Sequence, residues 1–129
     1  MSTSGLSHIN FHAERPLLDA LLDFYCDIVG LSQGHRPPFR DFGYWLYAGD
    51  RPVVHLYVAM PSEERRTDVA TTFDHIAFDC ANRPEVEDGI RRHGLEYRTA
   101  VVPLTQQVQI FLKDPAGNSV ELNFAESQG

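Results

Sequence analysis

The sequence has little that would recognise a nucleic acid. It contains a single lysine, Lys113, ten scattered arginines and a formal net charge of −7. No basic stripe is therefore available to neutralise phosphates, and we expect no nucleic-acid partner. A strongly anionic substrate held by several lysines is also disfavoured, although Arg36, Arg40 and Arg98 can supply one or two contacts. The two cysteines have no C-x-x-C spacing, which excludes a disulfide-dense scaffold and a cysteine-based metal clip.

Long hydrophobic runs are also lacking. No apolar run approaches the roughly 20 residues of a membrane helix, and the first ten residues lack the layout of a signal peptide. The chain is 43% apolar and 22% charged, which is the balance of a soluble globular protein. We therefore expect a cytoplasmic protein that forms one domain over residues 1–129 and has no membrane partner.

Hydrophobic periodicity predicts the same series of elements in each half of the chain. A polar, charged linker over residues 61–71 separates the halves. The first half is expected to contain a strand (7–13), a helix (15–30) and a hairpin (42–60) that turns at Gly-Asp-Arg-Pro. The second half is expected to contain a strand (73–80), a helix (83–94) that starts at a proline and stops at a glycine, and a hairpin (108–124).

The two halves are also similar in sequence. HINF at residues 8–11 matches HIAF at 75–78, and VHLYVA at 54–59 matches VELNFA at 120–125, with offsets of 67 and 66 residues. The sequence therefore predicts two copies of a β-α-β-β-like unit. Module one covers about residues 5–60 and module two about residues 72–126.

The repeat changes the interpretation of two histidines that would otherwise be read as ordinary core residues. His8 and His75 occupy the same place in the first strand of each module, and His55 and Glu121 occupy the same place in the last strand. Strand alternation places His55 and Glu121 on the sheet face opposite their apolar neighbours. A carboxylate there is costly to bury without a positive partner. If these faces curl toward one another, a divalent cation suits one glutamate and three imidazoles.

Two further motifs carry a family resemblance. FYCDIVGL at the end of the first predicted helix and FLKDPAGNSVEL in the last predicted hairpin are similar to motifs of the vicinal oxygen chelate superfamily. This superfamily contains glyoxalase I, extradiol dioxygenases, methylmalonyl-CoA epimerase and the bleomycin and fosfomycin resistance proteins. The resemblance covers nearly the whole chain. It implies an α+β fold in which two βαβββ modules form an incomplete barrel around a metal, commonly in a homodimer, with the cavity built from one chain or from two.

The resemblance also implies roles for single residues. His8, His75 and Glu121 fall on the ligand positions, and His55 falls on a fourth, more variable one. His55 is then either a ligand or a base beside the metal, and Glu121 or His55 is the candidate catalytic residue that moves a proton. Phe111 stands where dioxygenases carry an assisting tyrosine. The metal is a divalent ion of Fe, Mn, Ni, Zn or Co.

Alternation predicts which side chains share the ligand face and could bind a substrate. They make an aromatic and amide-lined wall that suits a flat or moderately apolar molecule, and ordinary sheet packing is the alternative for each of them. The predicted substrate contacts are Asn10, Trp45, Tyr47, Tyr57, Gln107, Gln109, Phe111 and Asn123. The segment 34–43, with two prolines and two arginines, is either a loop over the cavity mouth or a plain surface loop.

Three functions remain open at this point. The first is a metal-dependent enzyme, a lyase, isomerase or ring-cleaving dioxygenase, that binds two oxygens of a small substrate. The second is a metal-free drug-binding protein of the bleomycin-resistance type, for which no converging ligands are needed. The third is a structural or regulatory protein with an inert metal. Fold analogy does not choose among the reactions.

Overall fold

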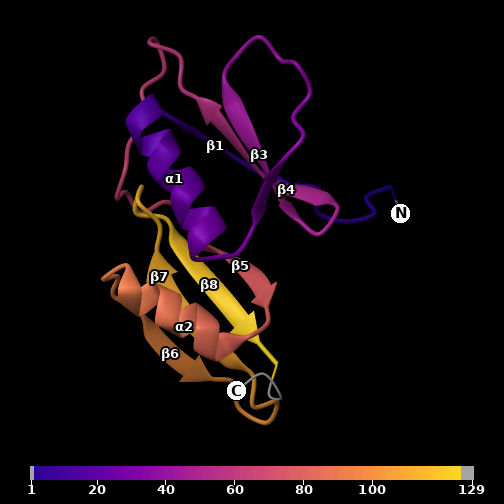
Figure 1. Cartoon of the computed structure of the whole chain (residues 1–129), viewed down its shortest axis with the longest axis vertical. Helices are drawn as coiled ribbons and strands as arrows, with labels where there is room; N and C mark the ends of the chain where they lie inside the picture. Colours follow the sequence, from indigo (N-terminus) through magenta and orange to yellow (C-terminus); the bar gives the residue numbers. More distant parts are fainter. Residues whose placement is uncertain (1, 126–129) are drawn as a thin grey trace. The chain divides into compact units, whose positions relative to one another are not determined.

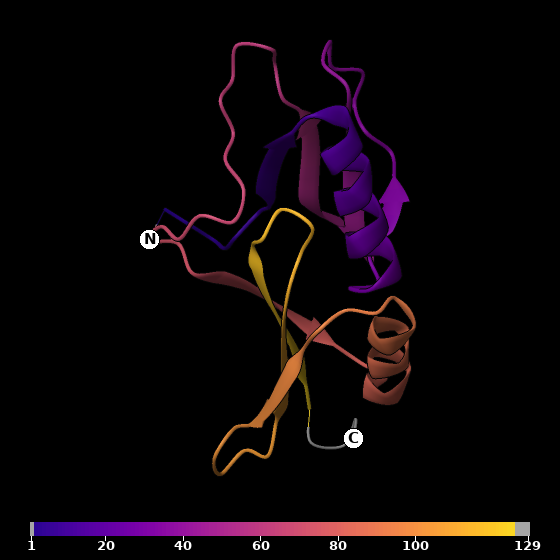
Figure 2. The same cartoon turned by 90° about the vertical axis from the view of Figure 1, so that its left-hand side faces the viewer.

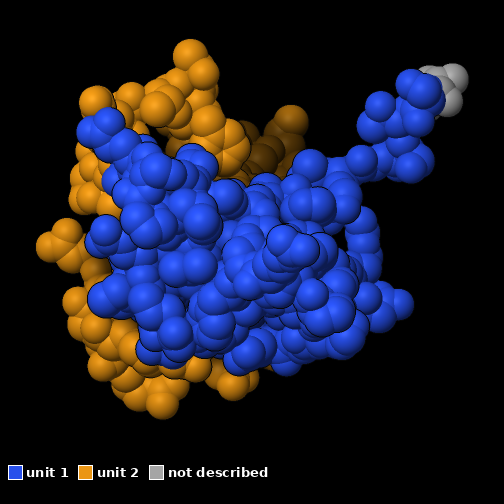
Figure 3. All heavy atoms as spheres, turned by 90° about the horizontal axis from the view of Figure 1, so that it is seen from above, with its two compact units in different colours: residues 1–26, 30–65 blue, residues 27–29, 66–129 orange. Residues whose placement is uncertain are grey.

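The computed structural model describes residues 2–125, which form two compact units (Figure 3). Unit 1 comprises Met1–Cys26 and Gly30–Arg65, and unit 2 comprises Asp27–Val29 and Arg66–Gly129. Each unit has a four-stranded mixed sheet that is not closed into a barrel, with a helix beside it (Figures 1 and 2). The predicted α+β fold with two βαβββ modules is therefore confirmed. The ends of the predicted single domain, residue 1 and residues 126–129, lie outside the described residues.

Unit 1 has its helix on one face of the sheet and leaves the other face to the candidate ligands. Its elements are β1 (Ile9–Ala13), α1 (Arg15–Asp27), β2 (Ser32–Gly34), β3 (Gly43–Ala48) and β4 (Arg51–Val58). The strand order is β1-β4-β3-β2, with β1 parallel to β4. The Tyr25 ring of α1 stacks on Phe11 of β1, and Val54 and Leu56 of β4 are fully buried. This packing commits the opposite face of β4 to His55 and Tyr57.

Unit 2 repeats this plan. Its elements are β5 (His75–Cys80), α2 (Arg83–Arg92), β6 (Arg98–Val101), β7 (Val108–Lys113) and β8 (Ser119–Phe124), and its strand order is β5-β8-β7-β6. As predicted, α2 has a proline in its first turn and stops at a glycine: Gly94 has φ +67°, and the Leu95 N–H donates to the Ile90 carbonyl. Among residues 2–125, no helix is both long enough and apolar enough to span a membrane.

The register of the strands confirms the internal repeat. In the parallel pair of unit 1, Ile9 is opposite Val54, and in the parallel pair of unit 2, Ile76 is opposite Val120. These positions are related by the same offsets of 67 and 66 residues that relate the matching sequence segments. The residue before each isoleucine and the residue after each valine are the four candidate metal ligands. The fold therefore places them at equivalent points of the two sheets.

The structure differs from the sequence prediction in three details. β2 and β6 were not predicted, because they are only three and four residues long and mostly exposed, so that they show no alternation of apolar residues. The first hairpin turns at Gly49 and Asp50 alone, with Arg51 and Pro52 already in β4. α1 ends at Asp27, although the buried apolar residues continue through Ile28 and Val29.

A buried aspartate organises the turn between β7 and β8. The Asp114 Oδ1 atom accepts hydrogen bonds from the backbone N–H groups of Ala116 and Asn118 at 2.9 and 3.0 Å, and Oδ2 accepts one from the Asn118 amide at 3.0 Å. Asp114 is buried, and Ala116 and Asn118, which donate these hydrogen bonds, are half-buried. The turn fixes the point at which β8 begins and hence the face on which Glu121 lies.

We expect Asp114→Ala to lower the free energy of unfolding by about 3 kcal/mol, because three hydrogen bonds to a buried carboxylate are lost and their donors remain. Equilibrium urea denaturation followed by circular dichroism measures this change. Asp88→Ala is the matched control, since Asp88 is exposed on α2 and forms a surface ion pair with Arg92, so a change within about 0.5 kcal/mol is expected. Equal losses in both variants would contradict this role for the turn.

Candidate functional site

In unit 1, the two candidate ligands are in direct contact. The imidazole rings of His8 and His55 stack with centroids 3.8 Å apart and an interplanar angle of 14°. On its other side, His55 stacks on the Trp45 indole, at 4.1 Å and 10°. His55 therefore lies between two flat rings, which fixes the plane in which its nitrogens can bind another group. The Nδ1 atom of His8 is 2.9 Å from the Ser7 hydroxyl.

The surroundings of His55 favour a neutral imidazole. His55 is only 5% exposed. Burial lowers the pKa of its imidazole, and the neighbouring His8 ring lowers it further. Its Nε2 atom lies 3.1 Å from the Pro52 carbonyl oxygen, which can only accept a hydrogen bond. The proton of the neutral ring is therefore on Nε2, and the lone pair is on Nδ1. A neutral imidazole with a free lone pair is the form that binds a metal ion or accepts a proton.

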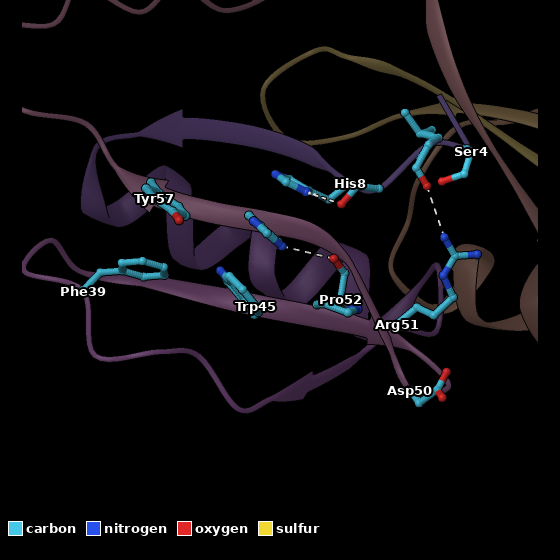
Figure 4. Close-up of a pocket in the computed structure, with 12 residues that line it drawn as sticks. Ser4, His8, Phe39, Trp45, Asp50, Arg51, Pro52 and Tyr57 are labelled. Atoms are coloured by element: carbon cyan, nitrogen blue, oxygen red, sulfur yellow. Dashed lines mark hydrogen bonds between the residues drawn. The ribbon is translucent and has the colours of Figure 1, made fainter. Parts of the chain in front are cut away.

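Aromatic side chains extend the His8 and His55 stack into the wall of a cavity of about 660 Å³ (Figure 4). Trp45 and Tyr57, which were both predicted as substrate contacts, line it together with Phe39. The Phe39 ring is 6.1 Å from the rings of both Trp45 and Tyr57. These distances are typical of packed aromatic groups. Unit 1 thus offers a hollow beside its two histidines that is lined by aromatic rings and also by Asp50 and Arg51.

The loop between β2 and β3 lies over this ring-lined face, which favours the first of the two interpretations of segment 34–43. The Arg36 guanidinium packs over the rings of Phe39 and Tyr57, at 5.0 and 4.8 Å, and donates to the Asp41 carbonyl oxygen at 2.8 Å. Gly43 permits this approach, because a Cβ atom there would collide with the Leu56 carbonyl oxygen and touch the guanidinium. Arg36 therefore fixes Phe39 at the cavity wall.

In unit 2, the other two candidate ligands also meet. The Nε2 atom of His75 is 3.3 Å from the Oε1 atom of Glu121. Glu121 is 7% exposed, whereas the His75 side chain is 41% exposed. A buried carboxylate on a strand is thus matched with an imidazole nitrogen that solvent can reach. This is the same pair of repeat positions that brings His8 and His55 together in unit 1.

His75 and Glu121 are each oriented by a hydrogen bond to a further side chain. Asp74 accepts a hydrogen bond from His75 Nδ1 at 2.8 Å, and this bond, with a smaller effect of Glu121, raises the pKa of His75. Gln109 donates from its amide to Glu121 Oε2 at 3.1 Å. A carboxylate bound to the far nitrogen of a histidine fixes its ring orientation, an arrangement common behind histidines that bind metals. The atoms left facing each other are His75 Nε2 and Glu121 Oε1.

The remaining predicted substrate contacts differ in where the structure places them. Asn10 is exposed but opposite His55 in register, and Gln109, Phe111 and Asn123 share the face of Glu121. Tyr47 packs over Gly34 at the β2 edge, with its hydroxyl donating to the His35 carbonyl, and Gln107 lies in the turn before β7. Within residues 2–125, no three His, Cys, Asp or Glu side chains gather into one metal-binding group. That all four candidate ligands bind one ion stays a prediction.

Sequence reasoning missed the placement of three side chains around these pairs, although it named Arg36 as a possible contact to an anionic substrate. Asp74 stands directly before His75, and this adjacency was the available signal. Phe39 and Arg36 belong to a segment that was recognised as a possible cover, but a loop without periodicity does not reveal which of its side chains turn inward. Only the cavity lining and the ring contacts identify them.

Comparisons with known proteins agree with this fold. No family model matches the chain. It is 30% identical over 124 residues to "Glyoxylase I 4" of Arabidopsis thaliana, covering 92% of this chain and 70% of that protein. A glyoxylase/bleomycin resistance protein/dioxygenase domain from Frankia sp. EAN1pec superposes with a TM-score of 0.73 at 15% identity, covering 96% and 99% of the two chains. The fosfomycin resistance protein FosX from Listeria monocytogenes, as an E126Q mutant in complex with Mn(II) and 1S,2S-dihydroxypropylphosphonic acid, has a TM-score of 0.67 at 18% identity, covering 95% and 93%.

The fold, the repeat and the sequence relative therefore lead to one assignment. The two βαβββ units match the architecture of the solved glyoxalase-type structures, and the plant relative extends the likeness to the sequence of most of the chain. The chain belongs to the vicinal oxygen chelate superfamily, the superfamily of the glyoxalases.

Proposed function

We propose that this protein is a divalent-metal-dependent enzyme that acts on a small organic substrate through two of its oxygens, by lyase, isomerase or dioxygenase chemistry. One observation carries the proposal: each unit holds two side chains of metal-ligand type in contact, at equivalent positions of the repeat. The Mn(II) ion in the FosX structure supports a metal in this superfamily. The proposed ligands are His8, His55, His75 and Glu121.

The chemistry of these donors fits a divalent transition metal. Imidazole nitrogens with one carboxylate suit Fe, Mn, Ni, Zn or Co, and no thiolate is required. Asp74 and Gln109 already orient His75 and Glu121, as residues behind metal ligands do. A positive ion would also compensate the buried Glu121 carboxylate, whose described partners are one amide and one imidazole.

The residues of the chain have separate tasks in this proposal. A bound metal would supply a Lewis acid that stabilises negative charge on two substrate oxygens. Trp45 and Tyr57 provide flat apolar surface for the substrate. Two buried polar atoms, the Trp45 N–H and Asn123 Oδ1, lack hydrogen-bond partners among residues 2–125. His55, kept neutral by burial, can take up a proton at Nδ1 if it is not a ligand.

The alternative is a metal-free binding protein. The aromatic cavity of unit 1 favours it, because a ring-lined hollow of about 660 Å³ is large enough for a drug-sized molecule. The paired ligands count against it, since a simple binding protein needs no buried carboxylate beside an imidazole. Metal content separates the two functions directly.

Protein purified without chelator is expected to contain about one divalent metal ion per chain by mass spectrometry of the metal. A sample stripped of metal and then titrated under anaerobic conditions with Fe(II), Mn(II), Ni(II), Zn(II) or Co(II) should bind one of them with saturation. Anaerobic titration with a catechol then tests for chelation through two oxygens. Metal content that stays far below one per chain after reconstitution would contradict the enzyme proposal and support the alternative.

A cytoplasmic homodimer belongs to the same proposal. Each sheet has two edge strands, β1 and β2 in unit 1 and β5 and β6 in unit 2, and unpaired edges favour association with a second copy. Light scattering of the metal-loaded protein at micromolar concentration is expected to give twice the chain mass of 14.6 kDa. A monomer that binds the metal fully would overturn the dimer and leave the ligand set intact.

A further inference from the structure

Unit 2 contains a second cavity, of about 860 Å³, at the β6 side of its sheet. It is lined in part by Arg98, Phe111, Lys113 and His75. Arg98 packs its guanidinium over the Phe111 ring, 4.1 Å from the centroid. Lys113, the single lysine of the chain, is exposed at the end of β7. Two cationic side chains therefore border one cavity in a chain whose net charge is −7.

No carboxylate among the described residues forms an ion pair with Arg98 or Lys113. The cavity lining does include two acidic residues. Asp74 already accepts a hydrogen bond from His75, and Glu96 is exposed. Arg98 is exposed and packs over Phe111, and its N–H groups have no hydrogen-bond partner within residues 2–125, so they can bind a carboxylate or phosphonate.

The sheet register relates these cations to the candidate ligands. Arg98 is opposite Phe111, which is opposite Glu121, so these three residues form one row across β6, β7 and β8. Lys113, Ser119 and His75 form the next row on the same face. Since neighbouring strands are about 4.8 Å apart, the backbone of each cation is roughly 10 Å from that of the candidate ligand in its row. A molecule of the size of one substituted ring spans this distance.

We propose that this cavity binds the anionic group, a carboxylate or a phosphonate, of a small organic acid, with Arg98 and Lys113 holding the anion and Phe111 packing against the apolar part. The substrate of the enzyme is then an acid whose charged end lies at β6 and β7 and whose chelating oxygens reach His75 and Glu121. This second statement rests on the proposed function, whereas binding of the anion does not.

The test uses ¹⁹F NMR titration of the full chain with three probes of similar shape: 4-fluorobenzoate, 4-fluorophenylphosphonate and the neutral 4-fluorobenzamide. The protein is first stripped of metal and dialysed free of chelator, so that no metal contributes. Both anions are expected to bind at least about tenfold more tightly than the amide, because hydrogen bonds between charged groups are the stronger ones. The relative affinity of benzoate and phosphonate identifies which anionic group the cavity prefers.

Variants assign the binding to the two cations. Arg98→Met and Lys113→Met are each expected to weaken benzoate binding about five- to tenfold, and the double variant should remove the preference over the amide. Arg92→Met is the control, since it removes the same charge from an exposed position on α2. Lys113→Met changes an exposed side chain and stays informative if Arg98→Met fails to fold.

Three results would overturn the inference: equal binding of the amide and the anions, a loss in Arg92→Met as large as in the other variants, or no binding of any probe at millimolar concentration. A repeat of the titration with Mn(II) present separates this inference from the proposed function. If the anion preference persists while no metal is taken up, the proposed function fails and the anion site stands. If metal binds without any anion preference, the anion site fails and the proposed function stands.

Discussion

Glu121→Gln is expected to lower the affinity of the protein for a divalent metal by at least about a hundredfold. The carboxylate is the anionic member of the proposed ligand set, and an amide of the same shape brings no charge to the ion. The affinity is measured by competition with a metal-binding dye, beginning from stripped protein. Turnover should be lost together with the metal once a substrate is known.

The fold should survive this change. Glutamine keeps the volume of the buried side chain, and its carbonyl oxygen can still accept the hydrogen bond from Gln109. Circular dichroism of the variant should therefore match that of the parent. Glu85→Gln on α2 is the matched control, because it removes one carboxylate near the surface of the same unit and should leave metal affinity unchanged. Undiminished metal binding by Glu121→Gln would remove Glu121 from the ligand set.

His55→Phe is expected to lower metal retention by about thirtyfold or more while leaving the ring stack in place. We prefer the ligand role for His55, because its Nδ1 lone pair is free and its position corresponds to that of Glu121. Phenylalanine can stack between His8 and Trp45 as the imidazole does, but it has no nitrogen to offer a metal. Metal analysis after gel filtration gives the retained fraction, and Trp45 fluorescence reports whether the stack is intact.

The same variant also tests the second role for this histidine. If His55 is a base beside the metal, His55→Phe should keep its metal and lose only turnover. His35→Phe is the control, since His35 is exposed and its hydrogen bond within residues 2–125 is made by its backbone carbonyl, which accepts from the Tyr47 hydroxyl. Full metal retention in both variants, with turnover lost only in His55→Phe, would assign His55 to proton transfer and leave the metal to the other three residues.

The sequence predicted those features that repeat or alternate. The strands β1, β4, β5 and β8 carry regular apolar patterns, and the match between the halves predicted that His8 is equivalent to His75 and that His55 is equivalent to Glu121. The structure confirms the fold and these positions. It leaves the binding of a metal by all four residues as a prediction, because no metal-binding group of three or more such side chains occurs within residues 2–125.

The features that sequence reasoning did not reach depend on packing in three dimensions. Gln107 is two residues before Gln109, so strand alternation would place both side chains on one face of the sheet. The Gln107 carbonyl instead accepts a hydrogen bond from the Val102 N–H in the turn, where alternation no longer fixes the direction of the side chain. A register shift separates Leu46 from Tyr47 in β3, and the Tyr47 ring lies over Gly34, the residue opposite Trp45. A local irregularity of this kind has no signal in hydrophobic periodicity.

The parallel pairing of β1 with β4 and of β5 with β8 also affects the order in which these contacts can form. His8 and His55 are 47 residues apart in the chain, and His75 and Glu121 are 46 apart, so the last strand of a unit must arrive before its two side chains can meet. Each pair is a long-range contact, so bringing its two members together costs the entropy of closing the chain between them. During synthesis, the growing chain therefore has no paired ligands of either unit until β4 or β8 has emerged and docked beside the first strand.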